Sequence, residues 1–218
     1  MQTIRFGDEG QTATRELVRR FETIAKDAAL PAHAAERIRA QLSTLQALDR
    51  QYGGSAKLPL EGVEELAASI VTDLATMDDA DLVIAAALWT LRHQVALTVV
   101  EPVVNALAQR SNRASGKSEV AAVFGLMQGV IAHTADALRA DLERSNPERA
   151  WRVLHVNLAI TAIRTEDPAM MDFAFDALDV ALPDERAGFY SEALALALAP
   201  GIAPEVRSRI EARHLRWT

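Results

Sequence analysis

The 218-residue chain contains no cysteine. This absence excludes a disulfide framework, a thiol nucleophile and a thiolate metal site, and it suits the reducing environment of the cytoplasm. Glycine and proline are also sparse, with 10 and 8 residues, whereas alanine and leucine are abundant. Such a composition favours helices that pack closely through small side chains.

Basic residues are too few for a nucleic-acid-binding protein. The chain has 23 Lys and Arg against 30 Asp and Glu, a formal charge of −7 at pH 7. Because phosphate binding requires a basic face that releases counterions, we expect no nucleic acid partner. The first ten residues lack the apolar run of a signal peptide or anchor. We therefore expect a cytoplasmic protein with a flexible tail at residues 1–10.

One long apolar stretch, residues 82–108, forms the centre of the sequence. A helix that is apolar on every side is a buried helix. A membrane span of about 20 apolar residues is the alternative, but Arg92, His93 and Gln94 interrupt the run, and a charge near a bilayer centre costs a few kcal/mol. We therefore predict a buried helical segment and no membrane partner. Pro102 lacks an N–H, so the helix should kink or restart near residues 98–101.

Hydrophobic periodicity and capping signals predict helices along the rest of the chain. We expect them over about 12–28, 31–52, 60–77 and 118–144, with loops at 53–59 and 111–118. The last of these helices should form an antiparallel hairpin with the apolar stretch. Together, residues 11–218 are predicted to form a single all-helical domain, which could divide into lobes 11–113 and 118–218 around the loop 111–118.

Four prolines at positions that suit helix starts divide the last third of the chain. Pro147 and Pro183 are 36 residues apart, as are Pro168 and Pro204. This spacing indicates two stacked αα-hairpins of the kind found in helical repeat proteins, although no named repeat consensus is present. The predicted fold is therefore all-α, a multi-helical orthogonal or antiparallel bundle of about 9–10 helices with two αα-hairpins stacked at its C-terminal end.

The same arrangement of Trp, Arg and His recurs in two apolar helices. The two sets are Trp89, Arg92 and His93, and Trp151, Arg152 and His155. In both, Trp and His are four residues apart and share a helix face. An Arg in an apolar setting requires an anion. One hypothesis is that both sets, with Asn157, converge on an internal pocket for a small acidic or aromatic ligand.

A structural role is the competing interpretation of the two Trp-Arg-His sets, and we favour it. In that case each Trp stacks on its own His, and each Arg extends to a carboxylate such as Glu101, Glu148 or Asp167. Buried ion pairs of this kind are more common than ligand pockets.

No motif indicates a metal, a cofactor or catalysis. A single Glu-x-x-His, from Glu211 to His214, is one copy where a di-iron bundle needs two. Gly116-Lys117-Ser118 precedes a helix but lacks the leading glycine of a phosphate-binding loop, and the chain has no nucleophile elbow. Asp172, Asp176 and Asp179 share one helix face, which we interpret as solvated. We therefore predict no catalytic residue, no metal and no cofactor, and find no positive evidence for an enzyme.

These observations favour a non-catalytic helical protein that acts as a protein–protein interaction module or scaffold. Its partner would be another protein or a second copy of itself, as in a homodimer. The alternative is a small-molecule-binding protein whose pocket lies between the two helices that carry the Trp-Arg-His sets.

Overall fold

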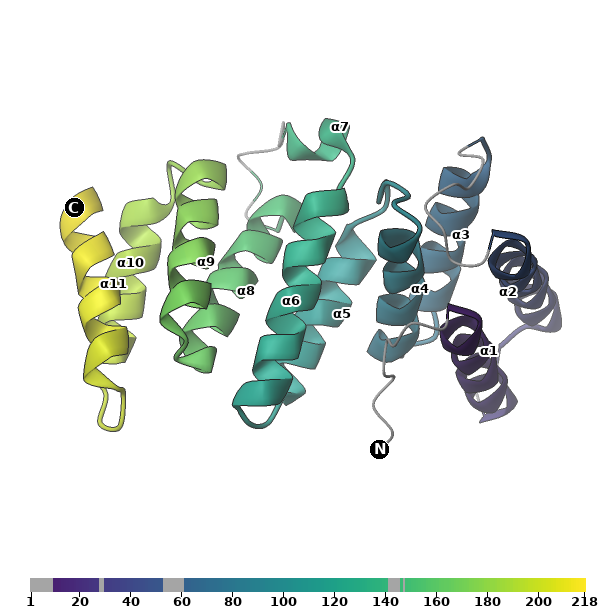
Figure 1. Ribbon diagram of the computed structural model, residues 1–218, viewed down its shortest axis with the longest axis horizontal. Coiled ribbons are helices and arrows are strands. Elements are labelled where there is room, and N and C mark those ends of the chain that lie inside the picture. Colours follow the sequence, from purple (N-terminus) through teal and green to yellow (C-terminus); the bar gives the residue numbers. More distant parts are fainter. Residues whose placement is uncertain (1–9, 28–29, 53–60, 141–145, 147) are drawn as a thin grey trace. The chain divides into compact units, whose positions relative to one another are not determined.

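A computed structural model describes residues 10–27, 30–52, 61–140, 146 and 148–218 (Figure 1). These residues form eleven helices and no strand, which confirms the all-α prediction with one or two helices more than expected. The helices are α1 (Gly10–Asp27), α2 (Ala32–Tyr52), α3 (Val63–Ala75), α4 (Ala80–Arg92), α5 (Glu101–Arg113), α6 (Lys117–His133), α7 (Asp136–Arg139), α8 (Ala150–Thr165), α9 (Pro168–Ala181), α10 (Arg186–Ala197) and α11 (Pro204–Trp217).

The chain divides into two compact units. Unit 1 comprises residues 1–110 and 129–140, and unit 2 comprises residues 111–128 and 141–218. The boundaries fall within α5 and α6. The loop expected at 111–118 is shorter than predicted, because residues 111–113 belong to α5 and residues 117–118 to α6, which leaves 114–116 outside the helices. The expected tail at 1–10, except for Gly10, and the expected loop at 53–59 lie outside the described residues.

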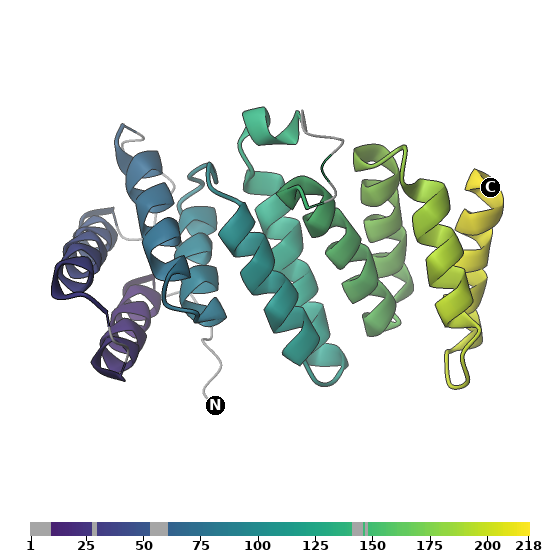
Figure 2. The same cartoon turned by 180° about the vertical axis from the view of Figure 1, so that it is seen from behind.

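Four helices form the larger part of unit 1 (Figures 1 and 2). Helix α1 packs on α2, α2 on α3 and α3 on α4, and α4 packs back on α1. The residues that meet in the middle are aliphatic or aromatic and almost fully buried: Leu17, Phe21, Ile38, Leu42, Leu45, Ile70, Leu74 and Leu82. Each of these helices is amphipathic except α4, which is buried on nearly all sides, as predicted.

The long apolar stretch is two helices rather than one. Helix α4 ends at Arg92, residues 93–100 are not helical, and α5 begins at Glu101 with Pro102 in its first turn. The restart predicted near residues 98–101 is thus confirmed. Among the described residues, no helix combines the length and the apolar character that crossing a bilayer requires.

The intervening segment also determines where α6 ends. The Leu97 N–H donates to the His133 carbonyl at 2.8 Å, and the Ala135 N–H donates to the Leu97 carbonyl at 3.0 Å. Because the Ala135 N–H bonds to Leu97 and not to the preceding helical turn, α6 stops at His133. The prediction of one helix reaching about residue 144 is therefore wrong up to residue 140, and residues 141–144 lie outside the described residues.

Two αα-hairpins, α8 with α9 and α10 with α11, make up most of unit 2 (Figures 1 and 2). Helices α9 and α11 start at Pro168 and Pro204, as predicted. Asp167 caps α9 by accepting the Met170 N–H at 3.0 Å. The starts of α8 and α10 are 36 residues apart, at Ala150 and Arg186, so the predicted spacing holds for both hairpins. Pro147 lies outside the described residues.

Candidate functional site

The first Trp-Arg-His set lies on α4 in unit 1. The rings of Trp89 and His93 contact each other, with 4.5 Å between their centroids, and both side chains are buried. Trp89 Nε1 donates to Asp49 Oδ1 at 3.0 Å, and His93 Nε2 lies 2.7 Å from the same oxygen. The Thr14 hydroxyl donates to the other carboxylate oxygen. A carboxylate that is 1% exposed therefore joins α1, α2 and α4. Arg92, on the last turn of α4, is half-buried.

Hydrogen bonds keep Asp49 ionised in the core. Burial by itself raises the pKa of this carboxyl, but the hydrogen bonds with His93, Thr14 and Trp89 stabilise the charged form and bring the pKa below its ordinary value. Asp49 is not among the candidate residues predicted from the sequence. The sequence does contain a sign that Asp49 is buried, because Asp49 continues the apolar stripe of Ile38, Leu42 and Leu45 at helical spacing.

The second set lies on α8 in unit 2. Trp151 and His155 have ring centroids 4.3 Å apart, and His155 Nδ1 lies 2.8 Å from the Trp151 carbonyl oxygen. Arg152 forms an ion pair with Glu185, and so does Arg149, whose side chain is 8% exposed, at 3.0 Å. The carboxylate that Arg152 reaches is thus Glu185, which precedes α10, and not one of those suggested from the sequence.

Asn157, the remaining candidate on α8, donates through its side-chain amide to the Val153 carbonyl at 2.8 Å, one turn back along the same helix. The first set belongs to unit 1, whereas the second set and Asn157 belong to unit 2. In each set the Trp ring contacts its own His ring, as the structural interpretation expects, but the rings are tilted by 43° and 58° and not stacked flat. A ligand pocket shared by the two sets stays a prediction.

A second buried carboxylate, which we did not expect, joins the two hairpins of unit 2. Asp179 is 9% exposed and accepts hydrogen bonds from Tyr190 Oη at 2.9 Å, Arg213 at 2.8 Å and Trp217 Nε1 at 3.0 Å. Burial and the Asp179 carboxylate raise the pKa of Tyr190, which therefore remains a donor. The interpretation of this face as solvated is wrong for Asp179, because α10 and α11 pack over it.

Asp172 and Asp176, the other two acidic residues of this face of α9, are half-buried or exposed and pair with α11. Asp172 accepts from Arg209 at 2.6 Å, and Asp176 accepts from Arg213 at 2.7 Å. These residues pair with arginines across the hairpin interface, so their charges are already compensated within the fold.

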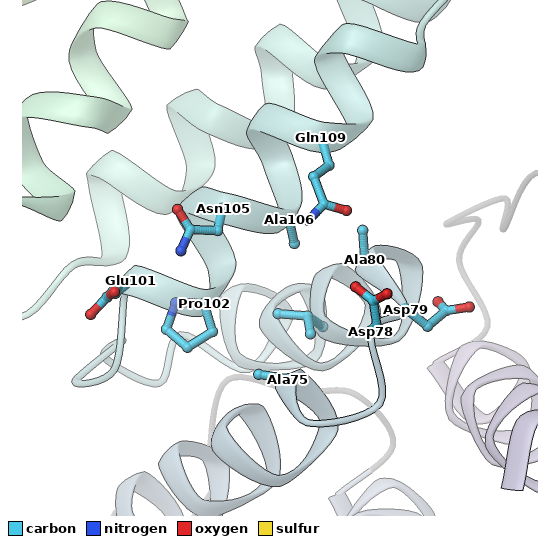
Figure 3. A pocket seen from close by; sticks show the side chains of 10 residues that line it. Ala75, Asp78, Asp79, Ala80, Glu101, Pro102, Asn105, Ala106 and Gln109 are labelled. Atoms are coloured by element: carbon cyan, nitrogen blue, oxygen red, sulfur yellow. The ribbon is translucent and has the colours of Figure 1, made fainter. Parts of the chain in front are cut away.

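Unit 1 contains an open pocket of about 380 Å³, a volume near the lower limit for small-molecule sites (Figure 3). Its walls are the end of α3, the turn before α4, the first turn of α4, and α5. Three carboxylates line it, from Asp78 and Asp79 at one end and Glu101 at the other. Asp79 is engaged in the fold, because it caps α4 through the Leu82 N–H at 2.9 Å and pairs with Arg20 at 2.8 Å.

The charge of this pocket favours a cationic group over an anionic one. Among the described residues, no group of three or more acidic or histidine side chains has the arrangement to hold a metal ion. Asp78 and Asp79 are not among the candidate residues predicted from the sequence, because nothing in the local pattern indicates that α5 packs opposite them.

Large apolar side chains are exposed mainly on the two hairpins of unit 2. Among the described residues, eight such side chains are exposed, and seven of them lie between residues 160 and 215: Ile160, Phe173, Val180, Leu196, Leu198, Ile202 and Leu215. Unit 2 therefore exposes more large apolar side chains than the described part of unit 1, where Leu138 is the one exposed.

No family model, curated protein or solved structure matches the chain in comparisons with known proteins. We therefore infer its function from the geometry of its own residues.

Proposed function

We propose that this protein is a non-catalytic helical binding module, and that the paired hairpins of unit 2 bind another protein. The observation that carries this proposal is that seven of the eight large apolar side chains exposed among the described residues lie on α8 to α11 or in the turn between α10 and α11. Burial of such side chains contributes roughly 1.5–3 kcal/mol each when a partner covers them completely. A few of them suffice for a specific contact.

The most suitable docking surface is formed by exposed side chains of α8 and α10 that occupy equivalent positions in the two hairpins. Ile160 and Leu196 occupy equivalent positions of the two hairpins, 36 residues apart, and they are 44% and 75% exposed. Repeated hairpins place equivalent side chains in a row, which is how helical repeat proteins build extended binding surfaces. A partner helix with apolar side chains at i, i+3 and i+4 fits such a row.

The internal pairing of the polar candidates supports a non-catalytic role. Trp89 and His93 use their ring nitrogens on Asp49 inside the core of unit 1, and Arg152 pairs with Glu185 in unit 2. A catalytic group must reach its substrate within hydrogen-bond distance. Side chains that are buried and already bonded to protein groups are better suited to hold helices together.

Quantitative affinity purification from the native host tests the proposal. We expect at least one protein that wild type retains and that Leu196→Glu loses by about tenfold or more, since a charge placed at a buried contact costs over 1.4 kcal/mol. Leu215→Glu is the matched control, because Leu215 is equally exposed but lies on α11. Far-UV circular dichroism of both variants checks that they remain folded. Retention of the same proteins by wild type and Leu196→Glu contradicts the proposal.

A further inference from the structure

The pocket of unit 1 has two parallel rows of side chains along α5. Glu101, Asn105 and Gln109 are four residues apart, so they form one row on the helix, and all three are exposed. Pro102 and Ala106 form a second row beside it, with Pro102 half-buried and Ala106 buried. The rim of this wall is therefore polar, whereas its inner row is apolar.

The opposite wall shows the same division. Ala80 and Val83, on the first turn of α4, are buried, whereas Asp78, in the turn before α4, is exposed. Figure 3 shows Glu101 at one end of the pocket and Asp78 at the other. We call these two residues the end carboxylates. The pocket thus combines an apolar floor with a carboxylate at each end.

Negative charge around this pocket is only partly compensated by the described part of the chain. Asp79 and Asp81 pair with Arg20 at 2.8 and 3.0 Å, and Arg110 lies 3.9 Å from Asp81. The end carboxylates form no ion pair among the described residues. Four carboxylates against two guanidinium groups leave a net charge of about −2. The partial positive charge of a helix N-terminus, about half a unit, is too small to cancel it.

We propose that this pocket binds a linear aliphatic diamine or polyamine, with an ammonium group at each end carboxylate and the methylene chain over the apolar floor. This goes beyond the proposed function, because it concerns unit 1 and a small molecule. An alkylammonium group has three donors and no acceptor, so it complements an ionised carboxylate, which only accepts. The side-chain carbonyl oxygens of Asn105 and Gln109 are further acceptors along the rim.

The separation of the end carboxylates favours this ligand over other cations. A metal ion needs ligands that converge on one point, and no group of three or more acidic or histidine side chains does so among the described residues. A lysine side chain of a partner protein carries one charge and would leave one end carboxylate unpaired. A molecule that is charged at both ends and apolar between them complements the whole pocket, whose volume of about 380 Å³ is suitable for a small ligand.

Isothermal titration calorimetry of the full chain tests this proposal with linear diamines from diaminobutane to diaminooctane, with spermidine, and with the monoamine of each carbon chain. Low ionic strength is required, because salt screens exposed charges. We expect the best diamine to bind one per chain with a dissociation constant below about 1 mM. It should bind at least about fivefold tighter than its monoamine, whereas two equivalent ends alone would give about twofold. Absence of one-to-one binding, or a diamine no better than its monoamine, overturns the proposal.

Variants that remove one charge distinguish the pocket from general attraction to an acidic protein. Glu101→Gln and Asp78→Asn should each weaken diamine binding by at least about threefold, to within about twofold of the monoamine. Asparagine tolerates the left-handed backbone of Asp78, whose φ is 51°. Glu65→Gln is the matched control, because it removes the same charge from the first turn of α3, whereas Ala75 at the pocket ends that helix. Circular dichroism checks that all three variants are folded. Equal weakening by all three overturns the proposal.

Two other probes identify a different occupant. A short lysine-containing peptide and magnesium chloride should each bind more weakly than the best diamine at equal ionic strength. Tighter binding of the peptide would assign the pocket to a partner protein, and tighter binding of magnesium would assign it to a metal ion, so either result overturns the proposal. The proposed function of unit 2 is tested separately by Leu196→Glu and stands or falls independently of diamine binding.

Discussion

Replacing Asp49 by alanine should be among the most destabilising single changes in unit 1. The change leaves Trp89 Nε1 and His93 Nε2, both buried, without the acceptor that they share. Each buried group left without its partner costs about 1–3 kcal/mol, and breaking a buried charged network costs about 3–5 kcal/mol. We therefore expect the free energy of unfolding to fall by about 3–5 kcal/mol, a large share of the 5–15 kcal/mol typical of a domain.

Urea unfolding followed by tryptophan fluorescence measures this loss, with circular dichroism as a second probe. The matched control is Glu22→Ala, which removes a partner of Arg39 whose side chain is 35% exposed and should cost less than about 1 kcal/mol. A double-mutant cycle of Asp49→Ala with Trp89→Phe should show a coupling energy of at least about 0.5 kcal/mol, because the two residues are in contact. A loss below about 1 kcal/mol for Asp49→Ala would refute the reasoning.

The same carboxylate makes stability depend on pH in the acid range. The pKa of Asp49 in the folded protein lies below its ordinary value because its hydrogen bonds outweigh its burial. A lowered folded-state pKa means that the stabilisation is complete above the unfolded pKa of about 4 and is lost as the pH falls through the folded pKa. The unfolding free energy of Asp49→Asn should therefore fall less steeply below about pH 4 than that of wild type.

Two further pairs of variants test the packing by urea unfolding. Asp179→Ala should lose about 3–5 kcal/mol, because it leaves three donors without their buried acceptor, whereas Asp176→Ala, whose side chain is largely exposed, should lose less than about 1 kcal/mol. Similar losses for the two would contradict the burial of Asp179. Gly125→Ala should gain about 0.5–1 kcal/mol, because the new methyl group has open space in a helix. Gly129→Ala should gain nothing, because its methyl group would lie 3.0 Å from Leu91 Cδ1. Equal gains in the two variants would show that the Leu91 side chain moves aside without a loss of free energy.

Local patterns in the sequence were sufficient to predict the class of fold and the positions of most helices. The apolar stripes, the prolines at helix starts and the break before Pro102 all act within one or two turns, so they can be recognised without knowing what packs against them. The repeated hairpins followed from the 36-residue spacing of Pro168 and Pro204 for the same reason. The contact between Trp and His was predictable too, because residues four apart meet on any helix.

Tertiary structure decided which side chains became partners. His93 and Trp89 bond to Asp49, more than 40 residues away in the case of His93, and no local pattern connects α2 with α4. Asp179 sits on what the sequence marks as a polar face, and only the packing of α10 and α11 buries it. The end of α6 likewise depends on a hydrogen bond to Leu97. Helical periodicity determines which face of a helix is apolar, but long-range packing determines which other helix covers it, and therefore where a charge is buried and what it meets.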